Sequence, residues 1–320
     1  AWGCGGNMTP DHYVDLFRQT ATFLKAPEGA RPIIIASGGN DEDTSWAEAL
    51  SSKVSPRELG AISFHYYTIP GELWKNKGPA TGFGEDQWIS TLSHTLRMER
   101  FITQNAAILD KYDPTKKIGF DVDEWGTWYD PAEGREPGFL YQQNTLRDAL
   151  VAAINFNIFH EHADRVRMAN IAQMVNVLQA MILTNGRQML LTPTYHVFHM
   201  FRPFQDATLL PSYLQTPQYS LGAVSVPAVS MSAARTAQGA IVVALVNLDP
   251  NQAIPVTTSI AGMSPQHVTG ELLTAAAMDA HNTFEEPYAV YTTAYTGASV
   301  SGGVLSLSLP AKSVVVLTLQ

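Results

Sequence analysis

The sequence has little charge, a single cysteine and no long apolar run, and each of these absences narrows the classes of protein it can encode. Charged residues make up 15% of the 320 residues, the net charge is −9, and lysine and arginine form no cluster. Nucleic-acid binding needs a basic patch, so no nucleic-acid partner is expected. No apolar run approaches the roughly 18–20 residues of a membrane-spanning helix, so no membrane partner is expected either. The lone Cys4 excludes an internal disulfide and leaves the cellular compartment open.

The sequence is rich in apolar residues, and these follow two different patterns along the chain. Hydrophobic residues make up 45% of the chain, enough for a sizeable core. Before Phe204, short apolar runs alternate with amphipathic segments, which predicts a parallel sheet with right-handed helical crossovers. The expected strands are residues 32–36, 61–65, 118–123 and 167–172. The expected helices start at Thr9 and cover about 44–53, 86–111, 140–159 and 194–204.

After Phe204 the composition changes, and lysine and arginine nearly disappear. Four segments read as short strands separated by Gly, Asn and Pro turns: AIVVALVNL, PVTTSI, GVLSLSLP and SVVVLTLQ. This pattern is typical of a β-sandwich or jelly roll. We therefore expect an α/β domain over residues 1–204 and an all-β domain over residues 205–320.

The most informative stretch is residues 118–129, IGFDVDEWGTWY. It reads as a buried strand whose carboxyl end carries Asp123 and Glu124 among aromatic rings, at the position where α/β enzymes place their chemistry. A carboxylate beside aromatic rings suits sugar chemistry, because rings stack on the sugar and a carboxylate attacks the anomeric carbon. The alternative is a surface acidic pair whose neighbouring rings fill the core. Since side chains alternate along a strand, Asp123 should face away from Glu124 and have a structural role.

Four motifs then match a known family in the correct order: WGCGGNM at the start, HYY after the second strand, DEWGTWY after the third, and NIAQMVNVLQAM after the fourth. Together they resemble glycoside hydrolase family 51, the α-L-arabinofuranosidases, over essentially the whole chain. The resemblance implies a retaining hydrolase on a (β/α)₈ TIM barrel with a C-terminal jelly roll. This chain would supply strands five to eight of the barrel and the jelly-roll domain, and no cofactor is implied.

The resemblance also assigns roles to individual residues. Glu124 matches the catalytic nucleophile, and Tyr67 is expected to donate a hydrogen bond to it. Without the resemblance, His65 reads more simply as a core histidine and Gln173 as the cap of a strand end. The substrate-binding residues implied by the resemblance are Trp2, His65, Tyr67, Trp128 and Gln173.

One departure from the family pattern concerns the acid/base glutamate, which the family places in an Asn-Glu pair immediately before the WGCGG motif. The resemblance implies that this residue, barrel strands one to four and the first jelly-roll strands are absent from this chain. The expected partners are therefore the missing N-terminal half of the same enzyme, further copies in a homo-oligomer, and an arabinose-containing oligo- or polysaccharide. Because half a barrel leaves sheet edges unpaired, we expect the chain not to be a stable monomer of 34.9 kDa.

Several alternatives stay open at this point. His160, Glu161, His162 and Asp164 resemble a metal cluster by composition, but their spacing fits a loop, so no metal is expected. Cys4 has no recognisable partner for a role as a thiol nucleophile. The protein can be part of an exo-acting arabinofuranosidase, a carbohydrate-binding remnant without hydrolysis, or a structural β-sandwich, and endoglucanase activity also occurs within the family. A cytoplasmic location is expected, with secreted and periplasmic locations left open.

Overall fold

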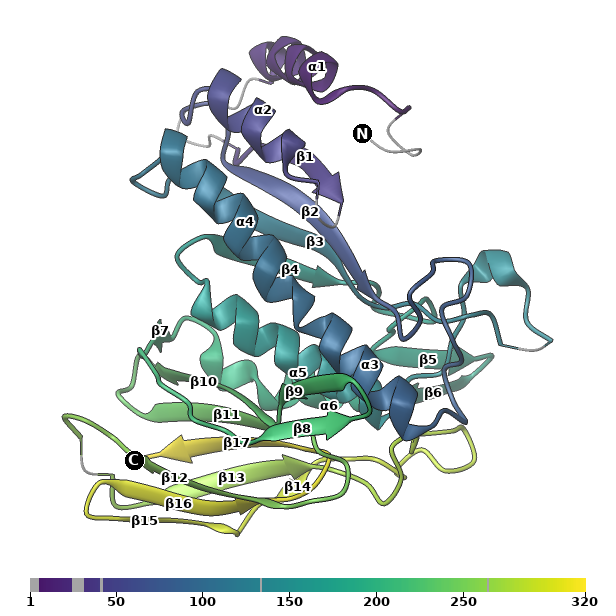
Figure 1. The fold of residues 1–320 in the computed structure, drawn as a ribbon, viewed down its shortest axis with the longest axis vertical. Coiled ribbons are helices and arrows are strands. Elements are labelled where there is room, and N and C mark those ends of the chain that lie inside the picture. Colours follow the sequence, from purple (N-terminus) through teal and green to yellow (C-terminus); the bar gives the residue numbers. More distant parts are fainter. Residues whose placement is uncertain (1–5, 25–31, 41–42, 133, 264) are drawn as a thin grey trace. The chain divides into compact units, whose positions relative to one another are not determined.

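The structure is a computed structural model that describes residues 6–24, 32–40, 43–132, 134–263 and 265–320 (Figure 1). The chain divides into two compact units. Unit 1 contains Ala1–Tyr67, Arg97–Trp125 and His162–Ile171. Unit 2 contains Thr68–Leu96, Gly126–Glu161 and Ala172–Gln320. Within the described ranges, no helix is both long enough and apolar enough to cross a membrane.

Unit 1 is built on a four-stranded sheet whose spatial order follows the chain. The strands are β1 (Ile35–Asn40), β2 (Ala61–Thr68), β3 (Gly119–Thr127) and β4 (Val166–Ile171). β1 pairs with β2 and β3 pairs with β4 in parallel, which confirms the α/β prediction for this part of the chain. β1 begins at Ile35, later than the strand expected over residues 32–36.

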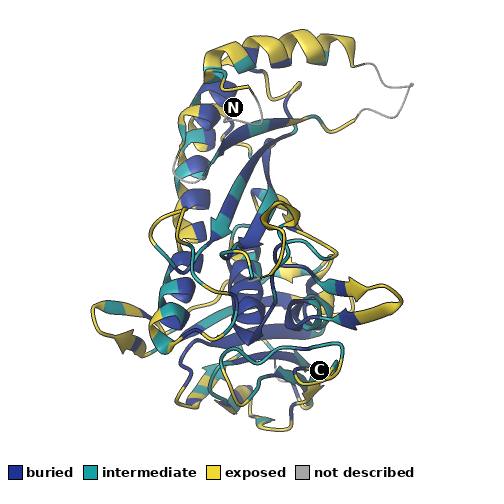
Figure 2. Cartoon of the chain, turned by 90° about the vertical axis from the view of Figure 1, so that its right-hand side faces the viewer, coloured by how far each residue is buried: buried dark blue, intermediate teal, exposed yellow. Residues whose placement is uncertain are grey.

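The helices of unit 1 are α1 (Pro10–Phe23), α2 (Ser45–Lys53) and α4 (Arg97–Tyr112). α1 begins where the sequence indicates, with the Thr9 side chain accepting a hydrogen bond from the His12 N–H and proline in the first turn. Most of α1 is exposed (Figure 2), and its buried residues are Val14 and Phe17. The Tyr13 hydroxyl accepts a hydrogen bond from the Ser37 N–H at 2.8 Å, which ties α1 to β1.

The single long helix expected over residues 86–111 is wrong, because the segment forms two helices. α3 (Glu85–Thr95) ends one residue before Leu96, and α4 begins one residue after it. The Thr91 and Thr95 hydroxyls donate to the backbone carbonyls of the residues four positions earlier. Hydroxyl groups bonded in this way commonly bend a helix, and the break follows directly after the second of them.

The helix expected from residue 140 begins later, as α5 (Leu146–Glu161). Leu140 has φ +53°, which is incompatible with a right-handed helix. At the observed start, the Asp148 carboxylate accepts hydrogen bonds from the Thr145 N–H at 2.7 Å and the Thr145 hydroxyl at 3.2 Å. The sequence from Thr145 to Asp148 has a hydroxyl residue followed three residues later by a carboxylate, which is a helix-start signal.

Unit 2 contains two larger antiparallel sheets. The six-stranded sheet has the order β14 (Thr293–Ala294), β13 (Val268–Leu273), β17 (Ser313–Leu319), β11 (Ile241–Asn247), β10 (Val229–Arg235) and β7 (Thr208–Leu209). The three-stranded sheet has the order β12 (Ile254–Ser259), β16 (Val304–Leu309) and β15 (Ala298–Ser301). The four strands expected from the sequence are β11, β12, β16 and β17, so their prediction is confirmed. The jelly-roll topology and the boundary at residue 204 stay predictions.

The remaining elements of unit 2 are short apart from α3 and α5. Two hairpins are formed by β5 (Ile182–Asn185) with β6 (Gln188–Leu191) and by β8 (Gln218–Leu221) with β9 (Val224–Pro227). The short helical segments are η2 (Pro137–Phe139), α6 (Pro193–Met200) and η3 (Arg202–Phe204). The helix expected over 194–204 is thus α6 followed by a separate 3₁₀ turn.

The core of unit 2 lies between α5 and the larger sheet. Every residue of β11 is buried, because α5 packs against one face of the sheet and β16 contacts β11 as well. A strand covered on both faces reads as a continuous apolar run rather than as an alternating pattern, and β11 has the sequence IVVALVN. α5 is correspondingly buried on nearly all sides, and most of its buried residues are apolar.

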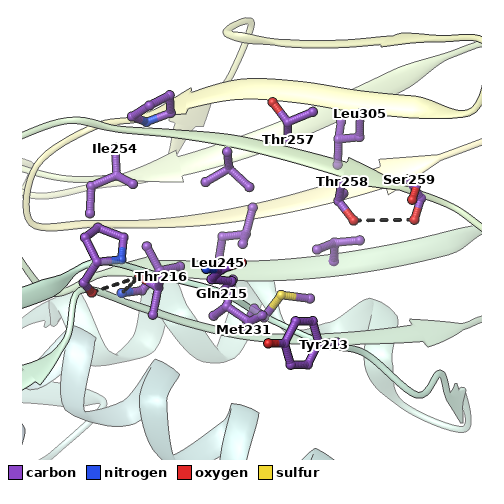
Figure 3. A pocket seen from close by; sticks show the side chains of 16 residues that line it. Tyr213, Gln215, Thr216, Met231, Leu245, Ile254, Thr257, Thr258, Ser259 and Leu305 are labelled. Carbon is purple, nitrogen blue, oxygen red and sulfur yellow. Dashed lines mark hydrogen bonds between the residues drawn. The ribbon is translucent and has the colours of Figure 1, made fainter.

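A cavity of about 580 Å³ opens between β10, β11 and the three-stranded sheet (Figure 3). Its walls are largely apolar, with Met231, Leu245, Ile254 and Leu305 among the lining side chains. Among the described residues, the lining contains no carboxylate, histidine, lysine or cysteine, and Tyr213 is its one ionisable side chain. Without a carboxylate or an imidazole to act as a base, the hydroxyl groups of the described lining are poor candidates for nucleophilic chemistry.

Candidate active site

The chemically richest cluster of unit 1 lies at the carboxyl ends of β2 and β3. The Tyr67 hydroxyl donates a hydrogen bond of 2.7 Å to Glu124 Oε2. His65 Nδ1 lies 3.4 Å from the same oxygen, and His65 Nε2 lies 3.1 Å from Asp123 Oδ1. The structure thus brings together three sequence candidates, His65, Tyr67 and Glu124, because adjacent parallel strands end at the same edge of the sheet.

Asp123 belongs to the same cluster, which corrects the expectation that it faces away from Glu124. Strict alternation holds only for a regular strand, and the pairing of β3 with β4 shifts register between Val122 and Trp125. Such an irregularity re-aims side chains locally. As a result, both carboxylates contact His65. By contrast, Tyr66 points into the core, where its ring meets Phe101 edge-on at 4.6 Å, as the alternation predicts.

The charges of the cluster perturb its ionisable groups. Burial lowers the pKa of His65, but Asp123 and Glu124 outweigh it and leave the pKa raised overall. The pKa of the Tyr67 hydroxyl is raised by burial and by the Glu124 carboxylate, so Tyr67 stays a proton donor. Burial and the charge of Asp123 raise the pKa of Asp121 to about 6. Asp121 Oδ1 is buried and has no hydrogen-bond partner among the described residues.

We expect the His65 ring to titrate above the 6.5 of an ordinary histidine, and to titrate lower in a Glu124→Gln variant. Because the pKa of His65 is raised in the folded state, protonation of His65 contributes to the free energy of unfolding. This contribution is complete below the unfolded-state pKa and is lost as the pH rises through the folded-state pKa. The measurement is an NMR titration of the His65 ring proton. Glu58→Gln, at an exposed position, is the control and should leave the titration unchanged. A His65 pKa below 6.5 in the wild type would contradict the assignment.

The other predicted site residues belong to unit 2 or lie outside the described residues. Trp128 is partly exposed; its backbone N–H donates to the Thr68 backbone carbonyl at 3.2 Å, and its ring meets Trp74 edge-on at 5.0 Å. Lys77 Nζ lies 5.9 Å from the Trp128 ring centroid. Gln173 is exposed, and its backbone N–H donates to the Val177 backbone carbonyl at 3.0 Å. Trp2 lies outside the described residues. The roles of all five predicted contact residues stay predictions.

Sequence reasoning missed the side chains that fix the backbone around Trp128. Gln179 Oε1 accepts a hydrogen bond from the Thr127 N–H at 2.9 Å. Gln142 Oε1 accepts one from the Tyr129 N–H at 3.0 Å, and its amide group donates to the Thr127 carbonyl at 3.2 Å. Both glutamines are buried, so their amides satisfy backbone groups that water does not reach. Gln179 lies in the NIAQMVNVLQAM motif, which was the available signal, whereas nothing in the sequence marked Gln142.

Two further carboxylates, Glu72 and Glu85, have partners within unit 2. Glu85 Oε1 accepts hydrogen bonds of 2.9 Å from the Tyr219 hydroxyl and from Asn251 Nδ2. Glu72 Oε1 lies 3.1 Å from Nε2 of the buried His94. Each of these carboxylates therefore has an anchoring contact within unit 2.

His160 has aromatic rather than metal-binding surroundings. Its ring stacks on Phe204 at 4.4 Å, and Nδ1 lies 2.9 Å from the Ser232 hydroxyl. Burial lowers the pKa of His160 to about 4, so the ring is neutral. No group of three or more potential metal ligands occurs among the described residues.

These observations define a candidate site of the glycoside hydrolase type, with a carboxylate held by a tyrosine and a histidine at the carboxyl edge of a parallel sheet. A sequence model described as "Alpha-L-arabinofuranosidase C-terminal domain" matches residues 123–313. The chain belongs to this family, and the resemblance to glycoside hydrolase family 51 is confirmed.

Individual relatives agree with this assignment. The chain is 42% identical, over its whole length, to an intracellular exo-α-L-arabinofuranosidase of Bacteroides ovatus, of which it covers 62%. It also matches the crystal structure of a family 51 arabinofuranosidase from Xanthomonas axonopodis pv. citri with a TM-score of 0.97 and 52% identity, covering 64% of that chain. A family 51 α-L-arabinofuranosidase structure from Bifidobacterium longum shares the fold at a TM-score of 0.81 and 22% identity. The chain thus spans less than two thirds of the length of these relatives.

Proposed function

We propose that this chain is part of a retaining, exo-acting α-L-arabinofuranosidase in which Glu124 is the nucleophile. The substrate would be the terminal α-L-arabinofuranosyl residue of arabinan, arabinoxylan or arabino-oligosaccharides. The observation that carries the proposal is the hydrogen bond from the Tyr67 hydroxyl to Glu124 Oε2 at the carboxyl edge of β3. The match to relatives named as exo-acting arabinofuranosidases supports the substrate class.

In this proposal the two oxygens of Glu124 have different tasks. Tyr67 and His65 both contact Oε2, which fixes the orientation of the carboxylate. Oε1 then attacks the anomeric carbon, while the bond from that carbon to the leaving oxygen breaks. A water molecule subsequently attacks the same carbon, releases arabinose and returns the electron pair to Glu124.

Retention of configuration requires a second carboxyl group, about 5–5.5 Å from the first, that protonates the leaving oxygen and then deprotonates the water. Asp121 and Asp123 are poor candidates because they lie on the same strand as the nucleophile, with Asp121 buried. The relatives are longer than this chain. We propose that the acid/base glutamate lies in the part of the enzyme that corresponds to their additional length. The same part would complete the (β/α)₈ barrel and the jelly roll, and the whole enzyme would be a homo-oligomer.

The test is hydrolysis of 4-nitrophenyl α-L-arabinofuranoside by the full-length protein, with intact mass spectrometry of the sample. Proton NMR of the first product formed from an arabino-oligosaccharide distinguishes the stereochemical outcomes. We expect α-L-arabinofuranose to appear first and to mutarotate afterwards. Initial formation of the β-anomer would refute the retaining mechanism. Sugar binding without turnover would indicate a carbohydrate-binding protein instead.

A further inference from the structure

A lysine and two tryptophans lie together in unit 2, in the loop that follows β2 and the segment that follows β3. The Trp74 ring, in a residue that is 53% exposed, meets the Trp128 ring edge-on with centroids 5.0 Å apart. Lys77 Nζ lies 5.5 Å from the first ring centroid and 5.9 Å from the second. The Lys77 side chain is only 12% exposed, although most residues of this loop are exposed. Lysine is rarely buried without a partner, so specific contacts must hold it in this position.

The loop of residues 71–77 closes on itself. The Gly71 N–H donates to the Lys77 carbonyl at 3.0 Å, and the Asn76 N–H donates to the Leu73 carbonyl at 2.9 Å. A side chain at Gly71 would collide with the Asn76 carbonyl oxygen, so this close approach requires glycine. The loop is thus internally bonded, and its placement depends on contacts at its two ends.

Asp130 fixes the carboxyl-terminal end of this loop. Its Oδ1 accepts a hydrogen bond from the Lys77 N–H at 3.1 Å, and its Oδ2 accepts one from the Gly78 N–H at 2.8 Å. The Asp130 N–H in turn donates to the Gly78 carbonyl at 2.9 Å, and Lys77 Nζ lies 3.7 Å from Oδ1. Hydrogen bonds to an ionised acceptor are stronger than those between neutral groups. One carboxylate therefore joins the loop to the segment that carries Trp128.

Helix α3 fixes the amino-terminal end of the loop independently. The Ser90 hydroxyl donates to the Pro70 carbonyl at 2.7 Å, and His94 Nδ1 lies 2.7 Å from the Ile69 carbonyl oxygen. These contacts do not involve the Asp130 carboxylate. Loss of that carboxylate should therefore release one end of the loop and leave the chain folded.

From these contacts we propose that Asp130 and Lys77 are positioning residues for Trp128. They hold the Trp74 ring against the Trp128 ring and so fix its orientation. The consequence for the substrate rests on the proposed function, with Trp128 as a substrate-binding residue. A ring that is already oriented loses less conformational entropy when the sugar binds. Because such a contact serves the ground state and the transition state alike, its loss should raise KM and leave kcat nearly unchanged.

The first measurement is the circular dichroism of the indole pair in the full-length protein. Two indole rings in contact couple their electronic transitions and give an exciton couplet in the far ultraviolet. The difference between the spectra of the wild type and of Trp74→Phe isolates this couplet. Asp130→Ala should remove most of the difference signal. Asp130→Asn, which keeps one acceptor oxygen, should retain more of the signal than Asp130→Ala.

The second measurement is steady-state hydrolysis of 4-nitrophenyl α-L-arabinofuranoside. Asp130→Ala should raise KM about tenfold, the scale of one lost aromatic contact, with kcat within about twofold of the wild-type value. Lys77→Met keeps the length of the side chain but loses the ammonium group, so it should weaken the couplet and raise KM. Lys75→Met is the matched control, because Lys75 is exposed in the same loop, and it should change neither quantity.

The outcomes separate this proposal from the proposed function. Loss of the couplet with raised KM and retained kcat in Asp130→Ala supports the positioning role. A couplet that survives in Asp130→Ala overturns it, even if the wild type is an active arabinofuranosidase. Loss of the couplet with unchanged KM also overturns it, because the role of Asp130 would then be structural only. An inactive wild type would defeat the proposed function, and the couplet would still decide whether Asp130 places the Trp74 ring. If Asp130→Ala does not fold, Lys77→Met carries the same test.

Discussion

Replacing Glu124 by alanine should lower kcat for 4-nitrophenyl α-L-arabinofuranoside by on the order of 10⁴-fold, because no covalent intermediate can form without the nucleophile. The fold should persist, since the Glu124 side chain is 41% exposed and its loss creates no enclosed cavity. Steady-state kinetics on the full-length protein, with circular dichroism as a check on folding, measures both effects.

Chemical rescue distinguishes a nucleophile from a residue that merely binds substrate. Azide added to Glu124→Ala should restore turnover and yield the glycosyl azide of inverted configuration, because the small anion occupies the space of the lost carboxylate. Glu58→Ala, which changes an exposed carboxylate of unit 1, should retain wild-type activity. Activity of Glu124→Ala above one tenth of the wild-type value would remove Glu124 from the role of nucleophile.

Replacing Arg165 by methionine should lower the free energy of unfolding by about 3–5 kcal/mol, because it leaves a buried carboxylate without its partner. The Arg165 guanidinium is 1% exposed and lies 2.9 Å from Oδ2 of the equally buried Asp113. It also donates to the backbone carbonyls of Ile118 and Asp113 and pairs with Asp110. These contacts join the end of α4 to the starts of β3 and β4, so their loss should loosen the sheet that carries Glu124.

Urea unfolding followed by tryptophan fluorescence measures this loss. The matched control is Lys53→Met, because Lys53 pairs with Asp11 at 2.6 Å but both side chains are largely exposed. An exposed pair of this kind contributes about 0–1 kcal/mol. Equal destabilisation by the two substitutions would show that burial of the Arg165 pair is not what makes it important.

The sequence was sufficient to predict the features that depend on local patterns of residues. The apolar runs predicted the four strands of unit 1 and the strands β11, β12, β16 and β17, because a strand buried on one or both faces must be apolar there. Thr9 and Pro10 marked the start of α1 because capping acts within a single turn. The motif DEWGTWY identified Glu124 as the residue around which a site could form.

Prediction from the sequence failed where a side-chain hydrogen bond or a shift in strand register changed the structure that the local pattern indicated. The 86–111 segment has no proline or glycine to mark its break, which follows instead from threonine hydroxyls bonded back to the helix. Alternation predicted that Asp123 and Glu124 diverge, yet the register shift between β3 and β4 lets both reach His65.

The sequence by itself therefore determined most of the strands and the family, and it predicted Glu124 as the key carboxylate, since these depend on residue type and short spacings. Only the tertiary structure decided which side chains surround that carboxylate and how Gln142 and Gln179 fix the backbone beside Trp128. These contacts join residues far apart in the chain. Their geometry depends on strand register and on loop packing, and both involve segments distant in the sequence.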